Sequence, residues 1–124
     1  MTLKTYAALS IALCTPFALA AASSHWAHVP AKDHARVNPL PGSPEAAAAG
    51  ALVYRDHCLQ CHKADAQGDA RKRPSLRSDN VRSATDGDIE WFLRQGDLAH
   101  GMPSWSSLPV EQRWQIVAYL RSIQ

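Results

Sequence analysis

The pentapeptide Cys58-Leu59-Gln60-Cys61-His62 constrains this chain more than any other segment. A Cys-x-x-Cys-His pattern is typical of c-type haem attachment, in which each thiol forms a thioether with the porphyrin. The histidine that follows ligates the iron. If the segment is helical, the three side chains share one face, because residues three and four apart lie on the same side of a helix. The pattern predicts one covalent haem c, with Cys58 and Cys61 as thioether residues and His62 as proximal ligand.

Met102 is the predicted distal ligand of the iron. It is the only methionine besides the initiator. It lies between Gly101 and Pro103, which break regular structure, so a role as filler of a helical core is disfavoured. A thioether ligand raises the reduction potential of haem iron. His57 and His100 lie nearby in the sequence and are the competing candidates.

The first 22 residues have the pattern of a secretory signal peptide. Lys4 precedes an apolar run from Tyr6 to Ala22 that ends in small residues suited to cleavage. We expect residues 1–22, with Cys14, to be removed and the mature protein to be periplasmic. An uncleaved membrane anchor is the alternative, because the run is at the short end of the about 17–25 residues that span a membrane.

Residues 23–43 are expected to form a flexible leader. They contain three prolines and three histidines and show no apolar periodicity. This composition is typical of an extended linker. The histidines, His25, His28 and His34, have no i,i+4 spacing, so a metal site there is disfavoured.

Residues 44–124 are predicted to be one small all-α domain. Helix caps and apolar spacing indicate three helices, over about residues 44–57, 85–96 and 109–123. Ser43 and Thr85 are N-cap residues, and Gly96 is a C-cap residue. No alternating pattern of a β-strand is present.

These features resemble a class I c-type cytochrome, over about Pro44 to the end of the chain. The haem-binding pentapeptide is followed by Gly101-Met102-Pro103 and by an aromatic C-terminal helix. Gly50 and Tyr54 resemble a glycine and an aromatic residue that let the last helix of that family cross the first closely. The resemblance implies a small cytochrome c fold of three to four helices wrapped around one haem, with the N- and C-terminal helices crossing.

The resemblance also implies roles for residues around the haem. Pro74 and Leu76 match the family's Pro-x-Leu, whose proline carbonyl accepts a hydrogen bond from the proximal histidine. Trp105 is expected to pack on the haem or to bond a propionate through its indole N–H. The chain departs from the family at Lys63, where glycine is usual.

The predicted function is transfer of single electrons. An iron held by both His62 and Met102 has no open position for a substrate, so we expect no enzymatic activity. The resemblance to cytochrome modules that accompany quinoprotein dehydrogenases implies a dehydrogenase as donor and an oxidase or another cytochrome as acceptor. The alternatives are a haem enzyme or gas sensor with an open or labile sixth position, and a zinc or dithiol protein built on Cys58 and Cys61.

Charge gives little sign of other partners. Acidic and basic residues balance from Glu45 onward. The run Arg71-Lys72-Arg73 lacks the aromatic platform of a nucleic-acid site, so no nucleic acid is expected. This run and the acidic group of Asp86, Asp88 and Glu90 are candidate patches for steering a redox partner.

Overall fold

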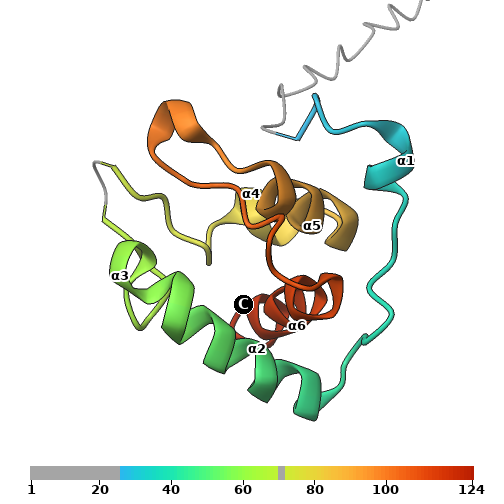
Figure 1. Cartoon of the computed structure of the whole chain (residues 1–124), viewed down its shortest axis with the longest axis horizontal. Helices are drawn as coiled ribbons and strands as arrows, with labels where there is room; N and C mark the ends of the chain where they lie inside the picture. Colours follow the sequence, from blue (N-terminus) through green and yellow to red (C-terminus); the bar gives the residue numbers. More distant parts are fainter. Residues whose placement is uncertain (1–25, 70–71) are drawn as a thin grey trace, which may run out of the picture.

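The computed structural model describes residues 26–69 and 72–124 and is all-α, as predicted (Figure 1). Its elements are α1 (Ala31–His34), α2 (Pro44–His57), α3 (Leu59–His62), α4 (Asp79–Ser83), α5 (Asp86–Gln95), the 3₁₀ turn η1 (Leu98–His100) and α6 (Val110–Ser122). Within these described ranges, β-structure is limited to two isolated bridges. The predicted signal peptide, Cys14 and Arg71 lie outside the described residues.

The three predicted helices are α2, α5 and α6, and their caps are as expected. The Ser43 hydroxyl accepts a hydrogen bond from the Ala46 N–H at the start of α2. Thr85 and Asp88 form a reciprocal capping box at the start of α5, and Gly96 ends that helix with a φ of 71°. No helix in the described part is long and apolar enough to cross a membrane.

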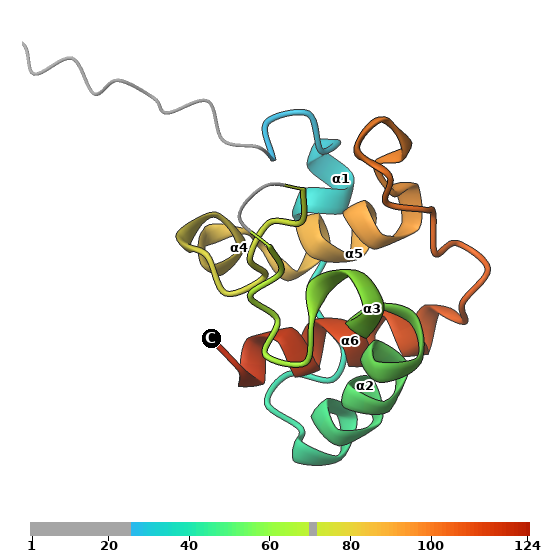
Figure 2. The same ribbon diagram turned by 90° about the vertical axis from the view of Figure 1, so that its left-hand side faces the viewer.

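Helices α2 and α6 cross each other, as Figure 2 shows. The crossing is close because Gly50 presents no side chain to the α6 backbone. One turn later the rings of Tyr54 and Tyr119 pack with centroids 5.1 Å apart. The predicted crossing of the N- and C-terminal helices is therefore confirmed.

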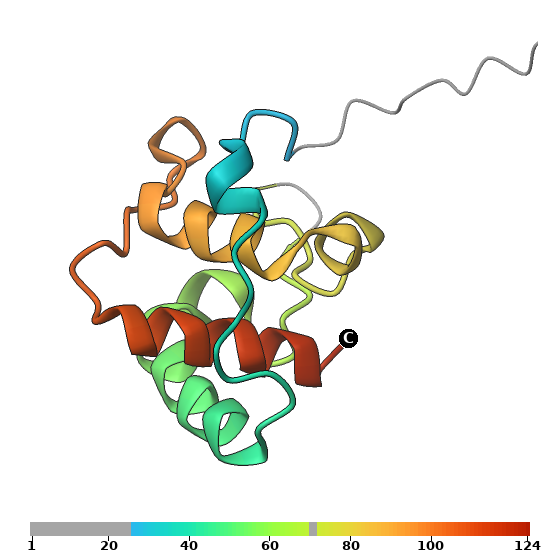
Figure 3. The ribbon, with the colours of Figure 1, turned by 90° about the vertical axis from the view of Figure 1, so that its right-hand side faces the viewer.

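Residues 26–42, which we call the N-terminal strap, differ from the expected leader. Figure 3 shows the strap passing over α5 and then running across α6. The Trp26 indole donates a hydrogen bond to the Asn80 carbonyl, and the buried Asn38 amide donates one to the Trp114 carbonyl. These polar contacts join the strap to residues far away in the sequence. Such contacts produce no apolar periodicity, so the sequence did not reveal that the strap is packed against the helices.

Candidate functional site

A cavity of about 490 Å³ brings the predicted site residues together. Its wall includes all six of them: Cys58, Cys61, His62, Pro74, Met102 and Trp105. The volume falls within the about 300–1,000 Å³ that is usual for small-molecule sites. The cavity is bounded by α2, α3, α5, α6 and the segment that carries Met102, so residues 40 positions apart, His62 and Met102, share one site.

The pentapeptide forms the expected helical turn. Cys58 caps α3, and its carbonyl accepts hydrogen bonds from the N–H groups of Cys61 and His62, at 3.1 and 2.9 Å. This turn directs both thiols and the imidazole to the same cavity. Both cysteines are free thiols. Burial, with a smaller effect of Cys61, raises the pKa of the Cys58 thiol to about 11.

His62 has the features of an imidazole that is held neutral. Burial lowers the pKa of His62, while the Pro74 backbone acts in the opposite direction and the Arg73 charge adds to the lowering. The Nδ1 atom of His62 is buried without a well-formed hydrogen bond. The Pro74 backbone lies near His62, but no well-formed hydrogen bond joins them, so the expected pairing of His62 with the Pro74 carbonyl stays a prediction. A neutral imidazole is the form that ligates a metal.

Met102 lies in a turn that two backbone hydrogen bonds close. The N–H of Asp97 donates to the Met102 carbonyl at 2.8 Å, and the N–H of Met102 donates back to the Asp97 carbonyl at 2.9 Å. Gly101 supports the turn with a φ of 79°. The half-buried Met102 side chain packs against the hydrophobic core and faces the cavity.

The two competing histidines also line the cavity, but each has another contact. The His57 ring packs against the Trp105 ring at 5.1 Å. The His100 Nδ1 atom lies 2.7 Å from an Asp97 carboxylate oxygen, and the His100 side chain is 80 % exposed. The assignment of Met102 rather than a histidine stays a prediction.

Sequence reasoning missed a second role of Tyr54, which it treated as a packing residue. The Tyr54 hydroxyl donates a 2.7 Å hydrogen bond to the carbonyl of Lys63, directly after the pentapeptide Cys58–His62. Lys63 has a φ of 66°, a region that favours glycine. The i,i+4 spacing of Tyr54 on α2 and Cys58, the residue that caps the end of α2, was the available signal, because both side chains line one cavity.

The acidic group proposed as a steering patch is not a surface patch. Asp88 is 1 % exposed and Glu90 is completely buried. Asp88 serves the capping box of α5, and Asp86 pairs with Arg121 at 2.7 Å. Their burial could not be predicted from the sequence, because charged residues at a helix start are ordinarily solvated. On the basic side, Lys72 and Arg73 lie at the cavity rim.

The residues present fit the predicted haem c. The cavity combines two free thiols, a largely buried imidazole, a thioether and apolar walls to which Ile89, Leu93, Ile116 and Leu120 contribute. By contrast, no group of three or more His, Cys, Asp or Glu side chains gathers as a metal site in residues 26–69 and 72–124.

Comparison with known proteins gave one family. A family model described as cytochrome c oxidase, cbb3-type, subunit III, matches residues 45–120, which is more than half of the 124 residues. No curated protein matches the chain. The matched region contains the pentapeptide, the Met102 turn and the crossing helices.

Proposed function

Since the chain belongs to the cytochrome c family described as cytochrome c oxidase, cbb3-type, subunit III, we propose that it is an exported one-electron carrier with iron held between His62 and Met102. Membership of this family makes the chain an electron-transfer protein with covalently bound haem c and redox protein partners. The axial ligands, the compartment and the identity of the partners belong to the proposal.

The observation that carries the proposal is the convergence of His62 and Met102 on one cavity. His62 comes from α3, and Met102 comes from the turn that follows α5. An iron with both axial positions filled exchanges electrons without binding substrate, and haem supplies that redox chemistry when bound. The chain's own residues hold it in place and set its surroundings.

Each site residue has a defined task in this proposal. Cys58 and Cys61 tether the haem, so that it stays bound through repeated encounters with partners. The Pro74 backbone, which lies near His62, is proposed to restrain the His62 ring through its carbonyl once haem is bound. Trp105 lines the cavity, where its ring packs on His57, and is proposed to pack on the haem or to bond a propionate.

The signal-peptide pattern of residues 1–22 supports a periplasmic location. The resemblance to cytochromes that accompany quinoprotein dehydrogenases supports an exported dehydrogenase as donor. The family description names an oxidase subunit, which supports an oxidase or another respiratory cytochrome as acceptor.

The axial assignment is tested with Met102→Ala in the purified ferric holoprotein. We expect cyanide to bind the variant much faster than the wild type, and the reduction potential to fall. The matched control is Leu98→Ala in the same segment. The Leu98 side chain is 79 % exposed and does not line the cavity. If the wild type bound cyanide as fast as Met102→Ala, the sixth position would be open, which favours the haem enzyme or gas sensor.

A further inference from the structure

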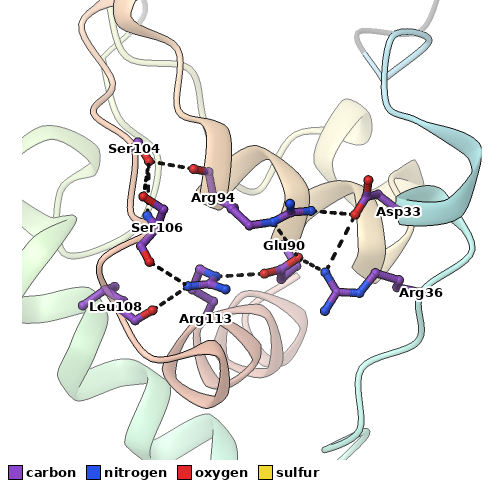
Figure 4. Close-up of polar contacts among 8 residues, drawn as sticks. All are labelled: Asp33, Arg36, Glu90, Arg94, Ser104, Ser106, Leu108 and Arg113. Atoms are coloured by element: carbon purple, nitrogen blue, oxygen red, sulfur yellow. Dashed lines mark hydrogen bonds and ion pairs between the residues drawn. The ribbon is translucent and has the colours of Figure 1, made fainter.

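A largely buried network of ion pairs and hydrogen bonds connects the N-terminal strap to residues 104–108, which follow Met102 in the sequence, as Figure 4 shows. Its centre is Glu90 of α5, whose side chain is completely buried. One carboxylate oxygen of Glu90 accepts a hydrogen bond from Arg36 of the strap at 2.5 Å. The other accepts one from Arg113 of α6 at 2.8 Å. A buried carboxylate needs such partners, because an unpaired charge in the interior costs several kcal/mol.

The same network reaches the strap a second time. Arg94 of α5 donates a hydrogen bond to the buried Asp33 carboxylate at 2.6 Å, and its Nε lies 3.7 Å from Glu90. The Arg36 guanidinium also covers the Trp114 ring, 4.9 Å from its centroid. The strap therefore completes the set of partners around Glu90.

Arg113 carries the network to the segment after Met102. Besides its bond to Glu90, the Arg113 guanidinium donates hydrogen bonds to the Leu108 carbonyl at 2.5 Å and to the Ser106 carbonyl at 3.4 Å. Its three bonds come from two nitrogens of one planar guanidinium, whereas a lysine ammonium has all its donors on a single nitrogen and cannot reproduce this geometry. Arg113 is thus fixed on one side by a buried carboxylate and on the other by the loop backbone.

The rest of this segment is attached to α5. The Ser104 hydroxyl donates a hydrogen bond to the Arg94 carbonyl at 2.6 Å, and the Trp105 N–H donates one to the Leu93 carbonyl at 2.8 Å. These anchors lie two to six residues after Met102. We therefore expect displacement of Met102 from the iron to strain these anchors.

We propose that Arg113, held by Glu90, whose other carboxylate oxygen is bound by Arg36 of the strap, is a positioning residue that keeps Met102 on the haem iron. The proposal rests on the His62–Met102 ligation proposed above. The expected consequence of weakening Arg113 is more frequent opening of the Met102 segment, since local opening is governed by the hydrogen bonds that close it. An external ligand then enters the sixth position more often.

The test compares two identical substitutions on α6. Arg113→Lys removes the fork that holds the carbonyls near Met102. The matched control is Arg121→Lys, because Arg121 pairs with Asp86 and donates to the Val81 and Ala84 carbonyls, a segment that does not carry Met102. The rate of cyanide binding is measured for each ferric holoprotein. Each measurement is made the same number of degrees below that variant's own melting temperature, so that the two variants are compared at similar stability. We expect Arg113→Lys to bind cyanide about tenfold faster than Arg121→Lys.

Two further readouts distinguish positioning from general destabilisation. The weak long-wavelength absorption band of methionine-ligated ferric haem should diminish at a lower temperature in Arg113→Lys than in Arg121→Lys. Amide hydrogen exchange should accelerate at Met102 and Trp105 in the first variant and stay near the wild-type rate in the second. Equal cyanide rates and equal exchange in the two variants would overturn the proposal.

The remaining outcomes are also decisive. If the wild type bound cyanide as fast as Met102→Ala, the proposed ligation by Met102 would be wrong, and the positioning role of Arg113 would be wrong with it.

If Arg113→Lys yields no holoprotein, Arg36→Lys replaces it in the test. This substitution weakens the strap's contact with Glu90 and leaves Arg113 unchanged. We then expect about a threefold acceleration over Arg121→Lys, and equal rates would overturn the proposal.

Discussion

Gly50 of α2 lies directly against the backbone of Gln115 on α6. A β-carbon added to Gly50 would lie 1.9 Å from the Gln115 carbonyl oxygen and 2.4 Å from its carbonyl carbon. Backbone atoms of a helix cannot move aside as the end of a side chain can. The two helices that support one side of the haem cavity therefore depend on the absence of a single methyl group.

Gly50→Ala is expected to destabilise the holoprotein by about 3 kcal/mol or more, because the helices must separate to relieve the overlap. Thermal unfolding followed by circular dichroism measures the loss. Gly42→Ala is the control, since its added β-carbon meets nothing within 4 Å and only its φ of 66° is unfavourable. That control should cost about 1–2 kcal/mol, and an equal loss for both variants would contradict the role of the crossing.

Lys63→Gly is expected to stabilise the holoprotein by about 1 kcal/mol. Lys63 has φ and ψ of 66° and 166°, a conformation that glycine adopts without strain. Its side chain is exposed, and the bond from Tyr54 goes to its backbone carbonyl, so both features survive the change. Chemical denaturation of the two holoproteins measures the difference.

Ala66→Gly serves as the comparison for Lys63→Gly. Ala66 also has a positive φ, of 59°, but its side chain is completely buried in the core. Removing that methyl group offsets the relief of strain, so we expect a change near zero or a loss. A gain at Ala66 as large as at Lys63 would show that burial is unimportant here.

The apoprotein is expected to be largely unfolded. A domain this small gains little from its own apolar core, whereas burying haem surface contributes about 25 cal/mol per Å². The double variant Cys58→Ser/Cys61→Ser should show weak helical circular dichroism and no cooperative melting. Native helix content in that variant would contradict the expectation.

Alkylation of the wild-type apoprotein tests the same expectation independently. In the folded arrangement burial raises the pKa of the Cys58 thiol to about 11, so little thiolate is present at pH 8. An unfolded chain removes that burial, and Cys58 and Cys61 should then react with iodoacetamide at similar rates. Marked protection of Cys58 would indicate a folded apoprotein.

Local patterns in the sequence were sufficient to predict α2, α5 and α6 and the helical turn of the pentapeptide, but not the short helices α1 and α4. The capping box at Thr85 and the cap at Ser43 are formed by residues three apart, so the bonds they make follow from the sequence directly. The helical turn of the pentapeptide follows for the same reason. The crossing at Gly50 was foreseen only through resemblance to a family, because its partner on α6 is far away in the sequence.

The sequence by itself determined which residues can attach haem, since Cys58, Cys61 and His62 lie within one helical turn. Only the tertiary structure decided the burial of Glu90 and the course of the strap. Arg36 and Glu90 are 54 positions apart, and Glu90 and Arg113 are 23 apart. Polar pairing over such separations has no periodic signature, because it depends on how the helices pack and not on the spacing along any one of them.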